Sequence, residues 1–334
     1  MQKFLIIQTA FIGDVVLSTP LLEKLHVFFP DAQIDFLLRK GNEQLFSGHP
    51  FIHQILIWDK GKNKQKNLFR LLSVIRKNRY DKVINVQRFF ATGLLAAFSG
   101  AKETIGFDKN PLSFLFTKKI KHVVGGESAM HETERNLKLI IHFTDASNYK
   151  PKLYPTAKDF SSIDEWVCDK FVTMSPASVW FTKQFPASKW ISFIRHVPAE
   201  YRIYLLGGPG DLAFCTSIQE SVNKPEIKVL AGTLSFLESA ALMTRAGMNY
   251  VNDSAPMHFA SAVNAPVTAV YCSTVPAFGF GPLSDIRHIV EIEQPLYCRP
   301  CGLHGYTSCP EKHFRCALEI TNDQLSRTLP DTFT

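Results

Sequence analysis

Short apolar runs alternate with amphipathic stretches along most of the chain. In the first part, β-rich runs are separated or followed by segments with helical periodicity. The expected strands are residues 4–8, 34–38, 54–57, 82–86 and 103–106, and the expected helices are residues 15–29, 65–77, 89–98 and 131–143. This alternation indicates an α/β fold with a parallel sheet, because parallel strands need crossover connections that are usually helices.

A second series of the same kind follows a polar, proline-containing stretch at residues 145–155. Its expected strands are residues 170–174, 202–206, 228–230, 247–251 and 267–271, and its expected helices are residues 188–196, 212–220, 235–244 and 256–263. We therefore predict two Rossmann-like domains whose parallel sheets face each other across a cleft. They are placed at residues 1–150 and 151–310, and residues 311–334 are expected to form a tail that packs back on the first domain.

Composition and charge narrow the classes of function. A length of 334 residues leaves room for two hydrophobic cores, and the first apolar run follows Met1 too closely for a cleavable signal. No apolar run approaches the roughly 18 residues of a membrane span, so a cytoplasmic protein is expected. Residues 1–150 hold 22 Lys and Arg against 13 Asp and Glu, whereas the remainder holds 15 against 17. The basic half suits nucleic acid, an anionic membrane surface or a phosphorylated acceptor, although clusters such as residues 60–66 and 118–121 are also compatible with solvated loops.

The segment from Asp253 to His258 is the most informative motif. It follows an apolar strand and combines Asp253 and Ser254 with Pro256 before a run of small residues. This pattern predicts a helix that begins at the carboxyl edge of a parallel sheet. The amide groups and the positive end of the helix dipole favour a phosphate or diphosphate there. The alternative is that Asp253 and Ser254 only cap the helix.

The first strand leads into a turn that contains Gly13 and Asp14 but no G-x-G-x-x-G. A dinucleotide-dependent dehydrogenase is therefore disfavoured. A carboxylate at this turn is suited to accept a proton from a substrate hydroxyl, and the adjacent glycine lets a second molecule approach closely. Alternatively, Asp14 is only an acid favoured by the helix dipole. A second glycine-rich turn, Gly207-Gly208, permits close approach of either a ligand or a neighbouring helix.

Two further residues in the second half are candidates. Lys183 lies in a polar and aromatic loop and can neutralise a leaving diphosphate, unless it is an ordinary surface lysine. Ser235 and Glu238 form an S-x-x-E pattern, which a helix capping box explains without a ligand.

Two potential metal motifs are weak. His131 to Arg135 lacks the second histidine of a zinc-peptidase helix, so that function is excluded on spacing. Four cysteines near the end of the sequence, Cys298, Cys301, Cys309 and Cys316, have the pattern C-x₂-C-x₇-C-x₆-C. A four-thiolate metal site is an open alternative, but reduced structural cysteines are favoured for a cytosolic protein. We expect neither a metal nor a cofactor.

Taken together, the chain resembles the ADP-heptose:lipopolysaccharide heptosyltransferases, glycosyltransferase family 9, which are inverting enzymes of the two-domain GT-B architecture. The resemblance covers essentially the whole chain and rests on the order of its segments. These are residues 12–16 with Thr19-Pro20, His131 with residues 134–137, Lys183 before Phe185-Pro186, Gly207-Gly208, Leu234-Ser235 with Glu238, residues 253–258 and the cysteine-bearing tail.

The resemblance implies roles for individual residues. Asp14 would be the general base, Lys183 would contact the donor phosphates and Glu238 the nucleoside. Residues 253–258 would hold the diphosphate and sugar, although Ala255 stands where the family usually has glycine. The full set of expected donor-binding residues is Gly13, Gly207, Gly208, Glu238, Asp253, Ser254, Ala255, Met257 and His258, and the expected acceptor-binding residues are Lys60, Lys62, Lys64 and Arg135.

The resemblance also implies partners. The first domain would bind the acceptor, a phosphorylated lipopolysaccharide core, and the second the donor, ADP-heptose. The protein would be cytoplasmic, with peripheral contact to the inner face of the membrane and no nucleic-acid partner. Three alternatives remain open from the residues alone: a nucleotide-sugar epimerase, a nucleic-acid-binding protein, and a protein that binds sugar nucleotide without turnover.

Overall fold

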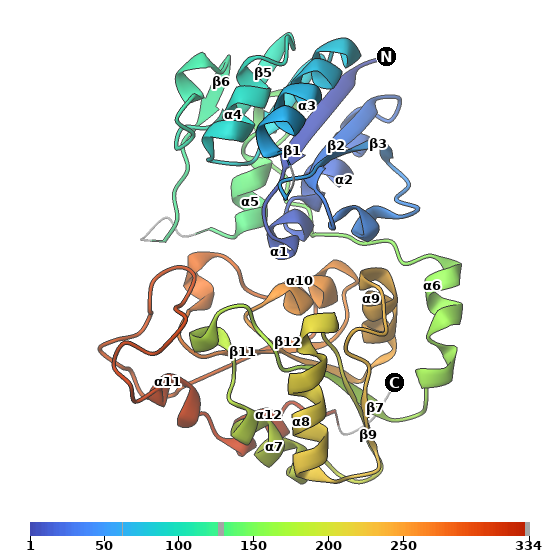
Figure 1. The fold of residues 1–334 in the computed structure, drawn as a ribbon, viewed down its shortest axis with the longest axis vertical. Coiled ribbons are helices and arrows are strands. Elements are labelled where there is room, and N and C mark those ends of the chain that lie inside the picture. Colours follow the sequence, from blue (N-terminus) through green and yellow to red (C-terminus); the bar gives the residue numbers. More distant parts are fainter. Residues whose placement is uncertain (62, 126–129, 331–334) are drawn as a thin grey trace. The chain divides into compact units, whose positions relative to one another are not determined.

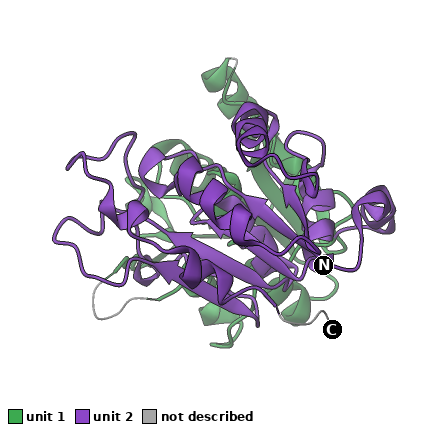
Figure 2. Cartoon of the chain, turned by 90° about the horizontal axis from the view of Figure 1, so that it is seen from below, with its two compact units in different colours: residues 1–154 green, residues 155–334 purple. Residues whose placement is uncertain are grey.

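The computed structural model describes residues 1–61, 63–125 and 130–330, which divide into two compact units (Figure 1). Unit 1 comprises Met1–Tyr154 and unit 2 comprises Pro155–Thr334, coloured separately in Figure 2. The boundary falls within the polar stretch 145–155 that the sequence predicts as the linker. No helix in the described ranges combines the length and the apolar character that a membrane crossing requires.

Unit 1 is built on a six-stranded parallel sheet with the order β3-β2-β1-β4-β5-β6. Its strands are β1 (Lys3–Gln8), β2 (Gln33–Arg39), β3 (Ile52–Trp58), β4 (Lys82–Asn85), β5 (Glu103–Phe107) and β6 (Lys118–Ile120). Its helices are α1 (Ile12–Val16), α2 (Thr19–Phe28), α3 (Lys64–Asn78), α4 (Phe90–Ala97) and α5 (Glu132–Leu137). The central strand β1 is apolar without alternation because helices cover both faces of the sheet, and residues 4–7 are completely buried.

Two expected helices of unit 1 differ from the structure. The predicted helix 15–29 is divided into α1 and α2, with the break at Leu17 and Ser18. The hydroxyl of Ser18 donates to the carbonyl of Val15, and that of Thr19 to the carbonyl of Val16, so both compete with regular helical bonding. The predicted helix 131–143 ends at Leu137, and only a short 3₁₀ turn follows at Ile141–Phe143.

Unit 2 repeats the architecture with a second six-stranded parallel sheet, in the order β12-β11-β10-β7-β8-β9. Its strands are β7 (Phe171–Ser175), β8 (Arg202–Leu205), β9 (Ile227–Val229), β10 (Met248–Asn252), β11 (Val267–Tyr271) and β12 (Arg287–Glu291). Its helices are α6 (Ala157–Ser162), α7 (Ala187–His196), α8 (Leu212–Val222), α9 (Phe236–Arg245), α10 (Ala255–Ala262), α11 (Arg315–Leu318) and α12 (Asn322–Ser326). The Rossmann-like character predicted for both domains is confirmed.

The end of the chain belongs to unit 2, and the expected contact of residues 311–334 with the first domain stays a prediction. Phe314, Cys316, Ile320 and Leu325 are buried in the hydrophobic core of unit 2. The hydroxyl of Tyr250, on the central strand β10, donates to the carbonyl of Leu325. Burial of these apolar side chains stabilises α11 and α12, which are too short to be stable alone.

A buried cation fixes the segment that leads to the unit boundary. Lys24 on α2 is completely buried, and its ammonium donates to the carbonyl oxygens of Asp145 and Ser147 at 2.7 and 2.8 Å. The Asp145 carboxylate lies 2.7 Å from the same ammonium. This ammonium lowers the pKa of Asp145 to about 2, chiefly through their hydrogen bond. One lysine therefore satisfies three acceptors on a segment without regular structure.

We expect Lys24→Met to lower the free energy of unfolding of unit 1 by about 2 kcal/mol, because the carbonyl groups of Asp145 and Ser147 lose their donor. The measurement is denaturant unfolding followed by tryptophan fluorescence, to which Trp58 contributes from unit 1. Lys119→Met removes an exposed lysine from the same unit and serves as control. Equal stability of the two variants would contradict the role of Lys24.

Candidate active site

In unit 1, the candidate base lies at the carboxyl end of the central strand. Helix α1 begins at Ile12, four residues after β1 ends, and Gly13 and Asp14 belong to its first turn. Asp14 is half-buried, and the side-chain amide of Gln8, the last residue of β1, donates to its backbone carbonyl at 3.4 Å. The sheet and the turn therefore fix the backbone that carries the carboxylate.

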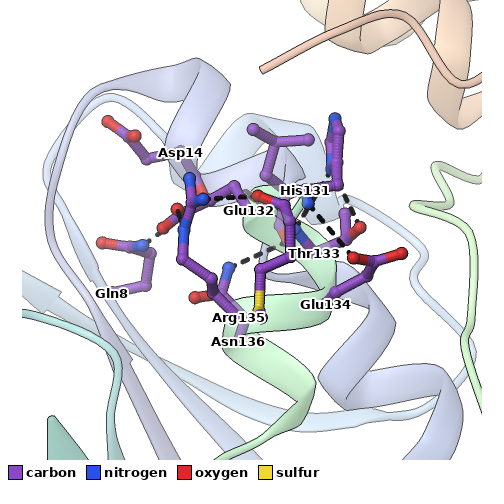
Figure 3. A network of polar contacts seen from close by, with 10 residues as sticks. Gln8, Asp14, His131, Glu132, Thr133, Glu134, Arg135 and Asn136 are labelled. Atoms are coloured by element: carbon purple, nitrogen blue, oxygen red, sulfur yellow. Dashed lines mark hydrogen bonds and ion pairs between the residues drawn. The ribbon is translucent and has the colours of Figure 1, made fainter. Parts of the chain in front are cut away.

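A second carboxylate, that of Glu132, lies near Asp14 (Figure 3). Glu132 begins α5, and its pKa is raised mainly by burial and further by the charge of Asp14. Arg135, one turn further along α5, opposes this shift and donates to the Glu132 carboxylate at 2.7 Å. Glu132 was not among the predicted site residues, although two acids in the first turn of a predicted helix were a visible signal.

Arg135 and its neighbours form a network that holds α5 in place. Arg135 is 2% exposed and donates to the backbone carbonyl of Met130 as well as to Glu132. His131 caps α5 together with Glu134, and Asn136 donates to the carbonyl of Leu17 between α1 and α2 (Figure 3). The burial of Arg135 argues against the expected direct contact with an acceptor and indicates that it positions Glu132.

Two of the lysines expected to bind the acceptor, Lys60 and Lys64, do not share one environment. The ammonium of Lys60 donates to the backbone carbonyl and hydroxyl of Thr9, just after β1, at 2.7 and 3.1 Å. It also lies 4.7 Å from the centre of the Trp58 ring. Partial burial and, secondarily, the nearby charges of Arg39 and Lys64 lower the pKa of Lys60 to about 8. Lys64 is exposed on the first turn of α3, and Lys62 lies outside the described residues.

In unit 2, three side chains converge at the carboxyl ends of neighbouring strands. Asp253 follows β10 directly, and one oxygen of its carboxylate accepts from the ammonium of Lys183 at 2.8 Å and the hydroxyl of Thr274 at 2.6 Å. The side chains of Lys183 and Asp253 are only 16% and 7% exposed. Lys183 is therefore a fixed cation beside the start of α10 and not an ordinary surface lysine. Thr274 was not among the predicted site residues.

The loop that carries Lys183 is held by the last residue of β10. Asn252 is completely buried, and its side-chain nitrogen donates to the carbonyl of Pro176 at 2.8 Å. Its side-chain oxygen accepts from the amide of Phe185 at 3.0 Å. A single side chain thus bonds both ends of the loop between β7 and α7.

Helix α10 begins at Ala255, with Ser254 as its N-cap residue and Pro256 in its first turn. The Ser254 hydroxyl lies 3.4 Å from the carbonyl of Asn252 and does not cap the helix. Because Ala255 is already helical, its methyl group requires no unusual backbone conformation. The predicted helix start at the sheet edge is confirmed, and the capping role of Ser254 is not observed.

The remaining members of this motif point into the protein. Met257 is completely buried, and its sulfur lies 3.3 Å from the hydroxyl of Tyr271. His258 is 5% exposed. A direct donor contact through the side chain of Met257 is therefore disfavoured by its burial, whereas the backbone of this first turn remains part of the predicted donor site.

The other predicted donor residues take part in local turns. A Cβ on Gly207 would lie 2.7 Å from the Cβ of Asp211, so the close approach here comes from the protein's own turn. The amide of Gly208 donates to the Asp211 carboxylate at 2.8 Å. Glu238 forms the capping box with Ser235, whose amide donates to its carboxylate at 2.7 Å. These contacts account for the local sequence, and donor binding by these residues stays a prediction.

Of the four cysteines in the C-x₂-C-x₇-C-x₆-C pattern, Cys298, Cys301 and Cys309 lie on the segment between β12 and α11, and Cys316 lies in α11. All seven cysteines of the chain are free thiols. The sulfur of Cys298 lies 3.8 Å from a ring nitrogen of His313. Within residues 1–61, 63–125 and 130–330, no group of three or more His, Cys, Asp or Glu side chains is arranged to hold a metal ion.

Two α/β units with parallel sheets, and a cation beside a helix start at the carboxyl edge of one sheet, are compatible with an enzyme that binds nucleotide-linked sugars. The family model described as "Glycosyltransferase family 9 (heptosyltransferase)" matches residues 68–305. The chain therefore belongs to glycosyltransferase family 9, the heptosyltransferase family.

Individual relatives agree with this assignment. A lipopolysaccharide heptosyltransferase 3 of Escherichia coli is 28% identical over 282 residues, which cover 79% of this chain and 82% of the relative. The solved ADP-heptose lipopolysaccharide heptosyltransferase II of E. coli has a TM-score of 0.78 at 20% identity, covering 98% and 97% of the two chains. The E. coli heptosyltransferase WaaC with ADP-2-deoxy-2-fluoro heptose has a TM-score of 0.72 at 17% identity, covering 98% of each chain. The structural likeness confirms the GT-B fold.

Proposed function

We propose that this heptosyltransferase transfers heptose from ADP-heptose to the phosphorylated inner core of a lipopolysaccharide, with inversion at the anomeric carbon. The observation that carries this proposal is the paired Lys183 and Asp253 at the start of α10. A fixed ammonium and a helix start stabilise negative charge, which is what a departing ADP develops. The lipopolysaccharide heptosyltransferases named above support the choice of acceptor, and the ADP-2-deoxy-2-fluoro heptose with which WaaC was solved supports the choice of donor.

Asp14 is the general base of the proposed reaction. Its carboxylate takes the proton of an acceptor hydroxyl while that oxygen attacks the anomeric carbon. The bond between this carbon and the donor phosphate breaks on the opposite side, and ADP leaves with the electron pair. Glu132 and Arg135 set the charge around Asp14 from α5. The sequence of bonds requires neither a covalent intermediate nor a resident metal, because Lys183 and α10 supply the positive charge.

Incubation with ADP-heptose and a heptose-accepting lipopolysaccharide core should release ADP only when both are present. The product should carry the new sugar with inverted anomeric configuration, which NMR spectroscopy reports. Conversion of the donor sugar without acceptor would instead identify an epimerase. A rise in melting temperature with ADP-heptose but no turnover would identify a binding protein without activity.

Asp14→Asn should lower kcat by on the order of 10²-fold or more, because the amide cannot accept the acceptor's proton. Its Kd for ADP-heptose, measured by calorimetry, should change little, since Asp14 acts on the acceptor. The control is Asp31→Asn, which neutralises an exposed acid of the same unit. Wild-type kcat in the Asp14 variant would remove this residue as the base.

Helix α3 is the surface that we propose for contact with the membrane. Its buried side carries Leu71 and Ile75, whereas Phe69 on its outer side is 62% exposed. No acidic residue occurs between Asp59 and Asp81, a stretch that holds eight lysines and arginines. An exposed aromatic ring among cations is complementary to an anionic bilayer, since the ring enters the interface while the cations meet lipid phosphates.

Replacing Arg70, Arg76 and Lys77 together by glutamine should weaken binding to vesicles that contain phosphatidylglycerol by about 100-fold, at about 1 kcal/mol per cation. Co-sedimentation at low salt measures this binding. The matched control replaces the exposed Lys118, Lys119 and Lys121, which also removes three charges. Equal losses in both variants would show that net charge alone matters, and binding of duplex DNA in preference to vesicles would favour a nucleic-acid partner.

A further inference from the structure

The cysteine-bearing segment between β12 and α11 reaches the loop that carries Lys183. The contact is made through Thr182, the residue before Lys183, which is 1% exposed. The amide of Tyr306 donates to the Thr182 hydroxyl at 2.7 Å, and the amide of Thr182 donates to the carbonyl of Tyr306 at 3.1 Å. Two residues far apart in the sequence are thus joined by one bond between their backbones and one bond from the Tyr306 backbone to the Thr182 side chain.

The residues after strand β11 supply a third partner to the contact between Thr182 and Tyr306, which we call the junction. Ser273, completely buried beyond the end of β11, donates through its hydroxyl to the Thr182 hydroxyl at 3.0 Å. The carbonyl of Ser273 accepts from the amide of Cys301 at 2.8 Å. Thr274, the next residue, donates to the carboxylate of Asp253 that holds Lys183. The junction and the candidate donor site therefore share one strand end.

The space beside Lys183 allows no side chain on the approaching segment. A Cβ on Gly305 would lie 2.8 Å from the Thr182 hydroxyl oxygen and 3.0 Å from the Cγ of Lys183. The φ of Gly305 is +75°, a conformation that other residues rarely adopt. Glycine is required here because the segment presses directly on the stem of the lysine.

We propose that Thr182 and Gly305 are positioning residues, which hold the Lys183 ammonium at the place where the donor phosphates bind. This inference rests on the proposed function, in which Lys183 stabilises the departing diphosphate. The stem of Lys183 is limited on one side by Gly305, while its ammonium is held by Asp253. Pre-organisation of this kind lowers the cost of fixing a flexible lysine during the reaction.

The test is a double-mutant cycle between Thr182 and Lys183, with kcat and the KM for ADP-heptose measured in each variant. Thr182→Val keeps the shape but removes the hydroxyl, and should lower kcat by about tenfold. Lys183→Ala should lower kcat by about 100-fold, since it removes a fixed charge from the diphosphate. In the Lys183→Ala background, Thr182→Val should have no further effect, because it acts only through the lysine.

Several variants separate positioning from a loss of structure. Thr182→Ser retains the hydroxyl and should restore most of the activity, whereas Gly305→Ala should lower kcat as Thr182→Val does. Thr244→Val, which removes a hydroxyl bonded within α9, is the matched control and should leave kcat unchanged. A Thr182→Val effect that persists in full without Lys183 would overturn the positioning role. Wild-type kinetics for Lys183→Ala alone would instead overturn the proposed phosphate contact.

Discussion

The donor half of the candidate site depends on the side chain of Asn252. This amide is buried at the end of β10 and bonds Pro176 and Phe185, on the two sides of the loop that carries Lys183. A buried amide left without partners is costly, so the loop is fixed wherever the strand is fixed. Because the loop is fixed, Lys183 has fewer conformations to lose when its ammonium bonds the adjacent Asp253. Two consecutive residues at the end of β10 therefore hold the site: Asn252 fixes the loop, and Asp253 fixes the Lys183 ammonium.

Most of the fold could be predicted from the hydrophobic pattern, and the exceptions have physical reasons. The central strands, such as β1, β7, β10 and β11, are buried on both faces, so their apolar runs are nearly continuous. Strands β6 and β12 were missed because they lie at sheet edges and carry exposed polar residues such as Lys118 and Arg287. An edge strand pairs its backbone groups with a neighbour on one side only and is partly exposed to solvent, so it can form without a continuous apolar run. Only the structure shows that α11 and α12 complete the core of unit 2.

The candidate site was less predictable because its contacts are long-range. Asp253 and Lys183 were visible as motif residues, but their ion pair joins positions seventy residues apart. The partners Thr274 and Tyr306 belong to segments that carry no local signal for such contacts. The burial of Arg135 was not predicted, because charged residues are rarely buried unless paired and the sequence does not show its pairing with Glu132. A sequence motif can indicate which side chains are able to bind a ligand, but it does not show which distant residues hold those side chains in place.

The two units divide the chemistry of the proposed reaction. Unit 2 carries a fixed ammonium and a helix start, while unit 1 carries Asp14 and Glu132, whose charges interact, together with the basic helix α3. Opposite charges within unit 1 are kept apart by position, since the acids lie near the start of α5 and the cations of α3 lie on an outer surface. In the reaction proposed above, such separation would let one unit both accept a proton and attract an anionic acceptor.

The net charge of unit 1 depends on pH through Lys60, which a count of charged residues does not show. With its pKa lowered to about 8, its ammonium loses a proton at a lower pH than a lysine with the ordinary pKa of about 10.4. As the pH rises through this pKa, the region beside the end of β1 loses one positive charge. The hydrogen bonds from Lys60 to Thr9 are then donated by a neutral amine. This edge of unit 1 therefore carries less positive charge in mildly alkaline solution than its number of lysines indicates.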